Sequence, residues 1–141
     1  MYMDMSAFMK GKAKQLPEEE KVITKLYEDE EGKPIPFKFK AIPTTLIDKL
    51  KADCTTIKYT KGQRIESFDR DRFSCKIGIE TTVFPDFKNA ELLQSYTCID
   101  PVDLTKAVLN LAGEYTEWIQ TCSRLNGFDD TIEELVKEAK N

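Results

Sequence analysis

The chain of 141 residues contains no histidine. Histidine is the commonest general base and metal ligand near neutral pH, so every Ser-His or Cys-His catalytic device is excluded. Its four cysteines, which are Cys54, Cys75, Cys98 and Cys122, include no C-x-x-C pair of the kind that holds zinc. The glycines form no phosphate-binding loop. We therefore expect a protein that is not an enzyme and that holds neither a metal nor a cofactor.

Long apolar runs are absent as well. No run approaches the roughly 20 residues that cross a bilayer, and the first 20 residues lack the basic and apolar regions of a signal peptide. We expect no membrane partner and a cytoplasmic location. In such a compartment the four cysteines are expected to be reduced core residues.

What is present is an ordinary globular composition with an uneven charge. Hydrophobic residues make up 40% of the chain and charged residues 33%, and the net charge is -4. The net charge is -3 over residues 1–32, +6 over 33–76 and -7 over 77–141. Two interpretations stay open: solvated faces of one domain, or a dipolar surface suited to self-association or to a charged protein partner. The overall acidity argues against nucleic acid.

The N-terminal part is predicted to combine an arm with a β-hairpin. Residues 1–20 are weakly patterned, and we expect them to be flexible or ordered only on a partner. Residues 21–141 are predicted to form a single domain. Val22–Tyr27 is β-branched and aromatic, and apolar residues alternate with polar ones from Ile35 to Ala41. These features predict two strands joined by an acidic turn at Glu28–Lys33.

Most of the remaining chain shows helical patterns. A helix is expected over 44–54, with Thr45 and Asp48 as a capping box, and a short hairpin is expected about Lys61 and Gly62. Two further helices are expected over 90–96, capped by Asn89, and over 101–113, which Asp100 and Pro101 open and Gly113 closes. A helix over 114–125 ends at Asn126 and Gly127, and a last helix follows Asp130. The predicted fold is α+β and mainly α-helical, with the N-terminal hairpin packed on a bundle of about five or six short helices.

The segment Asp69–Phe84 is ambiguous by local pattern. Apolar residues alternate strictly from Phe73 to Val83, which is typical of a strand. Phe73, Ile77 and Phe84 also fit helical spacing, and Asp69 could cap a helix. The period and the β-branching taken alone favour a strand.

Three stretches carry a resemblance to a known family. They read GKPIPFKFKAIP, FDRDRF…VFPDFKNAELLQSY and LAGEYTEWIQTCSRLNGFDDTIEELVKEAKN. In this order and spacing they resemble the XkdN-like phage tail assembly chaperones of PBSX-type prophages and long-tailed phages, over roughly residues 20–141. The resemblance implies a helix for Asp69–Phe84, and we adopt that prediction. Relatives usually have glycine after the tyrosine that matches Tyr96, whereas this chain has Thr97.

The resemblance also implies a function. Such a protein binds the tape measure protein and keeps it soluble, helps to recruit tail tube protein subunits, self-associates, and is not retained in the mature tail. Its expected location is the bacterial host cytoplasm. The alternative is a structural protein of the virion, namely a tail completion or connector subunit.

Five aromatic residues are candidates for partner contact. They are Phe84, Phe87, Tyr96, Tyr115 and Trp118. Aromatic side chains usually pack in the core, so each of these residues lies either there or in a groove that holds the partner.

Overall fold

The computed structural model describes residues 4–128 and has an α+β fold. Its helices are α1 (Thr44–Asp53), α2 (Arg70–Thr81), α3 (Ala90–Ser95), α4 (Pro101–Val108) and α5 (Ala112–Leu125), preceded by a short 3₁₀ turn, η1 (Met5–Phe8). The strands are β1 (Glu18–Lys21), β2 (Phe37–Lys40), β3 (Thr55–Thr60), β4 (Gln63–Phe68) and β5 (Thr82–Phe84). The predicted α+β class is thus confirmed. The last predicted helix, after Asp130, lies outside the described residues.

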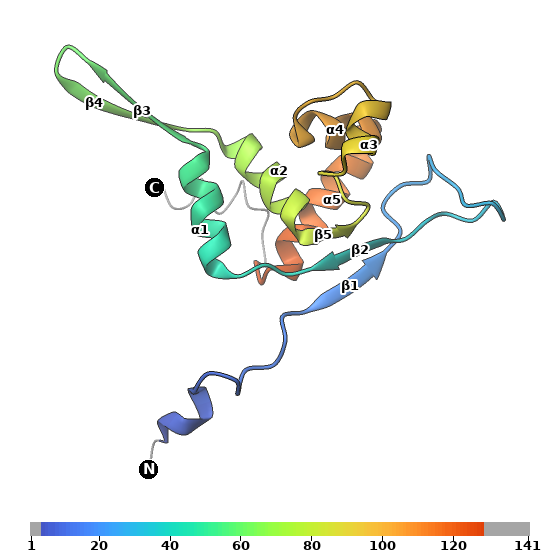
Figure 1. Cartoon of the computed structure of the whole chain (residues 1–141), viewed down its shortest axis with the longest axis horizontal. Helices are drawn as coiled ribbons and strands as arrows, with labels where there is room; N and C mark the ends of the chain where they lie inside the picture. Colours follow the sequence, from blue (N-terminus) through green and yellow to red (C-terminus); the bar gives the residue numbers. More distant parts are fainter. Residues whose placement is uncertain (1–3, 129–141) are drawn as a thin grey trace.

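Helix α2 lies at the centre of the molecule and contacts α1, α4 and α5 (Figure 1). The side chain of Asp69 accepts a hydrogen bond from the Arg72 backbone N–H at 3.1 Å and caps the helix. The prediction of a helix is therefore confirmed for Arg70–Thr81, although the last three residues of the segment form β5. Seven of the twelve residues of α2 are buried, on several sides of the helix, so the polar stripe is narrow and consists of the partly buried Arg72, Lys76 and Glu80.

A three-stranded antiparallel sheet in the order β1-β2-β5 packs beside these helices. Strand β2 follows the predicted alternation, with Phe37 and Phe39 buried and Lys38 and Lys40 exposed. The prediction of a first strand at Val22–Tyr27 is wrong, because the residues that pair with β2 are Glu18–Lys21. Buried Ile23 anchors the segment that follows β1 without belonging to a strand.

A separate two-stranded hairpin is formed by β3 and β4, as predicted about Lys61 and Gly62. Both turn residues have positive φ, at 52° and 79° respectively, which is the conformation that a two-residue hairpin turn of type I′ requires. In Figure 1 this hairpin projects away from the body.

Helix ends follow the sequence signals in part. Asn89 and Asp100 accept hydrogen bonds at the starts of α3 and α4, as expected. The predicted capping box of α1 is wrong: the helix begins at Thr44 behind Pro43, with no side-chain cap. Gly113 does not close α4, since that helix ends at Val108, before buried Leu109, and Gly113 lies in the first turn of α5.

Two apolar clusters hold the helices together. The larger surrounds Trp118, whose ring lies against Gly78 so closely that a Cβ there would be 2.7 Å from ring atoms. Trp118 Nε1 donates a hydrogen bond of 2.8 Å to Thr82 Oγ1, which satisfies the indole N–H in the core. The smaller cluster joins α1 to α2 through Leu50, Cys54, Phe73 and Ile77. Cys54, Cys75 and Cys122 are buried free thiols, and Cys98 is a partly buried one.

Candidate protein-binding surfaces

The five aromatic candidates lie in three different environments. Phe87 and Trp118 are fully buried and their rings meet edge to face, with centroids 5.5 Å apart. Tyr115 is half-buried beside Trp118, at a centroid distance of 5.6 Å. Tyr96 is half-buried and its hydroxyl lies 2.8 Å from that of Tyr27. Only Phe84 is largely exposed, at 50%, so these residues do not form one continuous surface.

A cleft of about 490 Å³ opens between α1, α2 and the loop that joins α3 to α4. We call it the α1–α2 cleft. Leu46 and Leu50 of α1 and Ile79 of α2 supply apolar lining. The loop adds Ile99, which is 96% exposed, and Val102 follows in α4. Such a fully exposed isoleucine beside an apolar floor is typical of a surface that binds another molecule.

Charged side chains surround this apolar floor. Lys49, Asp53 and Lys76 line the α1–α2 cleft and form no ion pair within the described residues. Four other charged residues there are paired: Arg72 Nη1 with Asp100 Oδ2 at 2.9 Å, and Lys88 Nζ with Glu80 Oε2 at 2.9 Å. The unpaired charges leave the cleft slightly positive, which favours an acidic partner.

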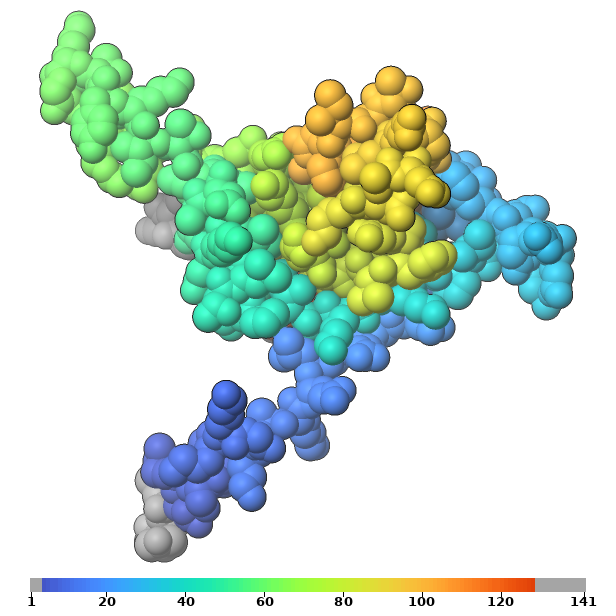
Figure 2. All heavy atoms as spheres, viewed as in Figure 1, coloured from blue at the N-terminus to red at the C-terminus, as the bar shows by residue number. Residues whose placement is uncertain are grey.

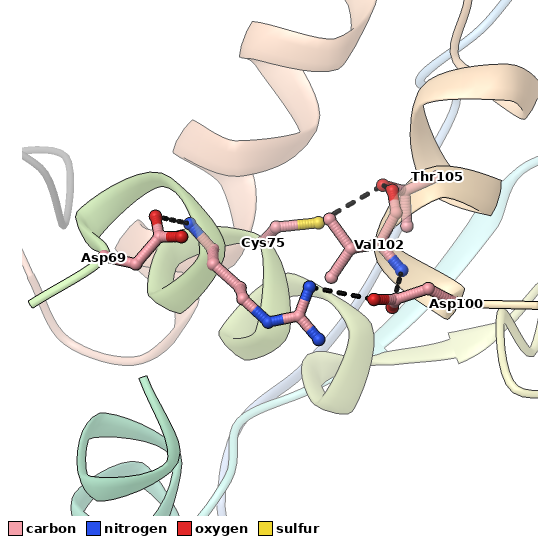
Figure 3. Close-up of polar contacts among 6 residues, drawn as sticks. Asp69, Cys75, Asp100, Val102 and Thr105 are labelled. Carbon is pink, nitrogen blue, oxygen red and sulfur yellow. Dashed lines mark hydrogen bonds and ion pairs between the residues drawn. The ribbon is translucent and has the colours of Figure 1, made fainter. Parts of the chain in front are cut away.

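Asp100 fixes one wall of the cleft. Burial would raise the pKa of its carboxyl, but hydrogen bonds from the Val102 backbone N–H and from Arg72 outweigh burial and hold the pKa below its ordinary value. Figure 3 shows Asp100 at the start of α4 with this bond to Val102, and Cys75 of α2 pointing to Thr105. The Cys75 Sγ to Thr105 Oγ1 distance is 3.2 Å. These contacts join α2 to α4 and position the loop that carries Ile99.

A second groove, of about 340 Å³, lies along the exposed face of the three-stranded sheet. We call it the β1 groove. It is lined by Glu18, Glu19, Glu20, Lys38, Phe39, Lys40 and Val83. Lys40 Nζ lies 3.8 Å from Glu18 Oε1, so Glu19 and Glu20 are the glutamates of this groove without an ion pair to a described residue.

Two segments extend from the body and expose large apolar side chains. The N-terminal arm and the β3–β4 hairpin project in different directions in Figure 2. The exposed apolar residues of these two segments are Met5, Phe8, Met9, Leu16, Ile57, Tyr59 and Ile65. Packing within the described chain covers none of them fully, so they are available to partners.

No cluster of three potential metal ligands lies within the described residues 4–128. Burial raises the pKa of the Cys122 thiol to about 12 and also raises that of Cys75, so both buried thiols are poor nucleophiles. Across the same residues, no helix is long and apolar enough to span a membrane.

The α1–α2 cleft has no signature in the sequence. Its loop residue Ile99 stands alone between a turn and the Asp100 cap, where no periodicity marks an apolar residue as functional. Lys49 and Lys76 read as ordinary exposed positions on two separate helices. Only the packing of α1 against α2 brings these residues to one place.

Comparison with known proteins gives the class that fits these surfaces. The model of the phage XkdN-like tail assembly chaperone proteins matches residues 5–140. The chain therefore belongs to the XkdN-like family of phage tail assembly chaperones, which in general are not enzymes and act on phage tail proteins.

Individual relatives agree with this assignment. The chain is 45% identical to the protein YqbN of Bacillus subtilis (strain 168) over 139 residues, which covers 98% of this chain and 93% of YqbN. It is 42% identical to the phage-like element PBSX protein XkdN of the same strain, over 98% of this chain and 94% of XkdN. A crystal structure of YqbN superimposes with a TM-score of 0.80 at 40% identity and covers 92% of this chain and 100% of that one.

Proposed function

We propose that this chaperone binds the tape measure protein in the α1–α2 cleft and keeps it soluble in the cytoplasm of the bacterial host. It then helps to recruit tail tube subunits and is not retained in the mature tail. The single observation that carries the proposal is the cleft itself, with its apolar floor and exposed Ile99. The tape measure protein is expected to be a long helical chain with an apolar stripe, which would aggregate if left uncovered.

The cleft suits an amphipathic helix. Leu46 and Leu50 lie one turn apart on α1, and Ile79 faces the same space from α2. An incoming helix could place its apolar stripe against these residues and keep its polar face in water. Ile99 would then cover one side of the bound helix and exclude water from the contact.

The unpaired lysines add a preference for charge. Lys49 and Lys76 stand on opposite walls, one on α1 and one on α2. Acidic residues beside the apolar stripe of a partner would pair with them, whereas basic residues would meet repulsion. The proposal therefore applies to acidic amphipathic segments of the tape measure protein.

Two further contacts belong to the same proposal. The part of the N-terminal arm that precedes β1 becomes ordered on a partner, which is supported by the exposed side chains of Met5, Phe8 and Met9. Copies of the chain also associate with one another while they cover a long partner. Of the aromatic candidates, Phe84 is the best placed for direct contact because its side chain is the most exposed.

Co-expression of the chaperone with the tape measure protein tests the proposal. We expect a complex that co-purifies and a larger soluble fraction of the tape measure protein. Ile99→Asp should reduce the recovered tape measure protein about tenfold, which corresponds to about 1.4 kcal/mol of binding free energy. The reason is that the new aspartate removes exposed apolar surface and repels an acidic helix, with little effect on folding.

Leu111→Asp is the matched control. Leu111 is also largely exposed, but it lies outside the α1–α2 cleft, at the start of α5. Its variant should recover as much tape measure protein as the wild type does. Equal recovery with Ile99→Asp would contradict the role of the cleft. Stoichiometric amounts of the chaperone in purified particles, measured by mass spectrometry, would instead identify a structural tail protein.

A further inference from the structure

The β3–β4 hairpin is exposed over nearly its whole length. Only Thr55 and Phe68, at its base, are partly buried. Ile57 and Tyr59 lie on one face of the hairpin together with their cross-strand partners Glu66 and Arg64, and Ile65 lies on the other face. An isolated two-stranded hairpin is marginally stable in water, and here both outer edges lack a neighbouring strand within residues 4–128. The hairpin therefore has the character of a segment that another strand completes.

The charge of the hairpin indicates what that strand carries. Lys58, near the middle of β3, and Lys61, in the turn, have no ion pair with a described residue, whereas Arg64 and Glu66 pair with each other at 3.6 Å. Strand β3 contains no acidic residue. A β3 edge that exposes lysine and Tyr59 fits an acidic strand edge beside a groove that can accept an aromatic ring.

The same chain carries such an edge. Strand β1 reads EEEK and forms the border of the three-stranded sheet, with a strand on only one side within residues 4–128. Glu19 and Glu20 line the β1 groove and form no ion pair with a described residue. Lys21 is engaged by Glu117 of α5, and Lys38 lies across from Glu20 on β2. The free border of β1 is therefore acidic and open.

We propose that β3 of one copy adds to the free border of β1 in the next copy, with Tyr59 entering the β1 groove, Lys61 beside Glu20 on that same face, and Lys58 beside Glu19 on the opposite face of the extended sheet. The backbone groups of the two open borders would be hydrogen-bonded to each other, so the added strand extends the three-stranded sheet. This inference rests on the self-association within the proposed function and names its surfaces.

The positions of the two surfaces determine the kind of assembly. The hairpin and the β1 strand lie on different sides of the body, with α1 and α2 between them (Figure 1). One copy can therefore donate its hairpin and accept another at the same time. Contacts of this head-to-tail kind repeat from copy to copy and form a ring or an open filament, whereas a self-complementary patch would stop at a dimer.

Charge reversal on each surface tests the inference in the full chain. The hairpin variant carries Lys58→Glu and Lys61→Asp; aspartate is chosen because it tolerates the positive φ of Lys61. The border variant carries Glu19→Lys and Glu20→Lys. Circular dichroism verifies that each is folded, and light scattering with sedimentation measures the mass. Lys10→Glu with Lys12→Asp, in the exposed N-terminal arm, is the control with the same change in charge as the hairpin variant.

Each variant alone should be a monomer at concentrations where the wild type and the control assemble. An equimolar mixture of the two variants should assemble again, because a reversed hairpin meets a reversed border and a normal hairpin meets a normal border. Assembly of either single variant, or a mixture that stays monomeric, would overturn the inference. A wild type that is monomeric at all concentrations would overturn self-association as well. Because recovery of the tape measure protein is measured separately, these results do not affect the test of binding in the α1–α2 cleft.

Discussion

Thr97 ends α3 in a conformation that usually belongs to glycine. Its φ is 55°, its N–H bonds to Gln94 O at 3.0 Å, and the Cys98 N–H bonds to Leu93 O at 2.9 Å. These two bonds form a Schellman motif, which closes helices and favours glycine at the position of positive φ. Helix α5 ends with the same pair of bonds about Gly127, whose φ is 91°. Thr97 thus stands where the family resemblance leads one to expect glycine, with the turn itself preserved.

Replacing this residue should stabilise the protein. A β-branched residue at positive φ costs about 1–2 kcal/mol, and the greater freedom of glycine in the unfolded chain offsets about half of the gain. We expect Thr97→Gly to raise the free energy of unfolding by about 0.5–1 kcal/mol in urea titrations. Thr116→Gly, at an exposed position inside α5, is the control and should lower it. A loss of stability in Thr97→Gly would contradict this reasoning.

Asp100 connects two elements, since it caps α4 and pairs with Arg72 of α2. Its pKa in the folded protein is below the ordinary value of 3.8. A carboxyl with a lowered pKa stabilises the fold when it is charged, and that stabilisation is complete above the unfolded value. It is lost as the pH falls through the folded value, because protonation removes the charge that Arg72 and the cap require.

Neutralising this carboxyl should therefore lower the stability of the fold only at higher pH. Asp100→Asn keeps a side chain that can cap a helix but removes the ion pair, which is partly exposed. We expect the variant to be about 0.5–1 kcal/mol less stable than the wild type above pH 5, with the difference shrinking below about pH 4. Asp103→Asn removes a charge from the same helical turn without an ion pair to a described residue, and it is the control. A difference that does not change with pH would contradict the role of the charge.

Helix α2 shows why local pattern alone could mislead at the scale of elements. Its side chains at Phe73, Cys75, Ile77 and Ile79 are all buried, although their spacing of two is typical of a strand. A helix packed against three others keeps only a narrow polar stripe, here Arg72, Lys76 and Glu80, so the period of 3.6 is weak in the sequence. The cap at Asp69 was the local signal that agreed with the observed helix. For β1 the signal was missing altogether, because an exposed border strand of glutamates has low β-propensity and only pairing with β2 defines it.

At the scale of the whole molecule, charge is divided between surfaces that lie apart. The projecting hairpin belongs to the +6 segment, residues 33–76, whereas β1 carries three glutamates of the acidic N-terminal segment. Attraction between such regions on neighbouring copies is partly exposed to solvent, and salt therefore screens it.

Salt should accordingly weaken self-association of the wild type. Raising sodium chloride from about 0.05 M to about 0.5 M shortens the screening length several-fold, so we expect the average mass in light scattering to fall toward that of the monomer. Circular dichroism at both concentrations provides the control that the fold is unchanged. A mass that does not respond to salt would show that the charge asymmetry is not the cause of association.

The sequence by itself determined the absence of histidine chemistry, the helix caps at Asp69, Asn89 and Asp100, and the family. These features are local, or they reside in the order of motifs, so no knowledge of packing is needed to recognise them. Only the tertiary structure decided that Phe87 and Trp118 are core residues while Phe84 is exposed. It alone brought Ile99 and Lys76 to one cleft and left β1 and β3 with free borders. The physical reason is that burial and strand pairing depend on contacts between residues far apart in the chain.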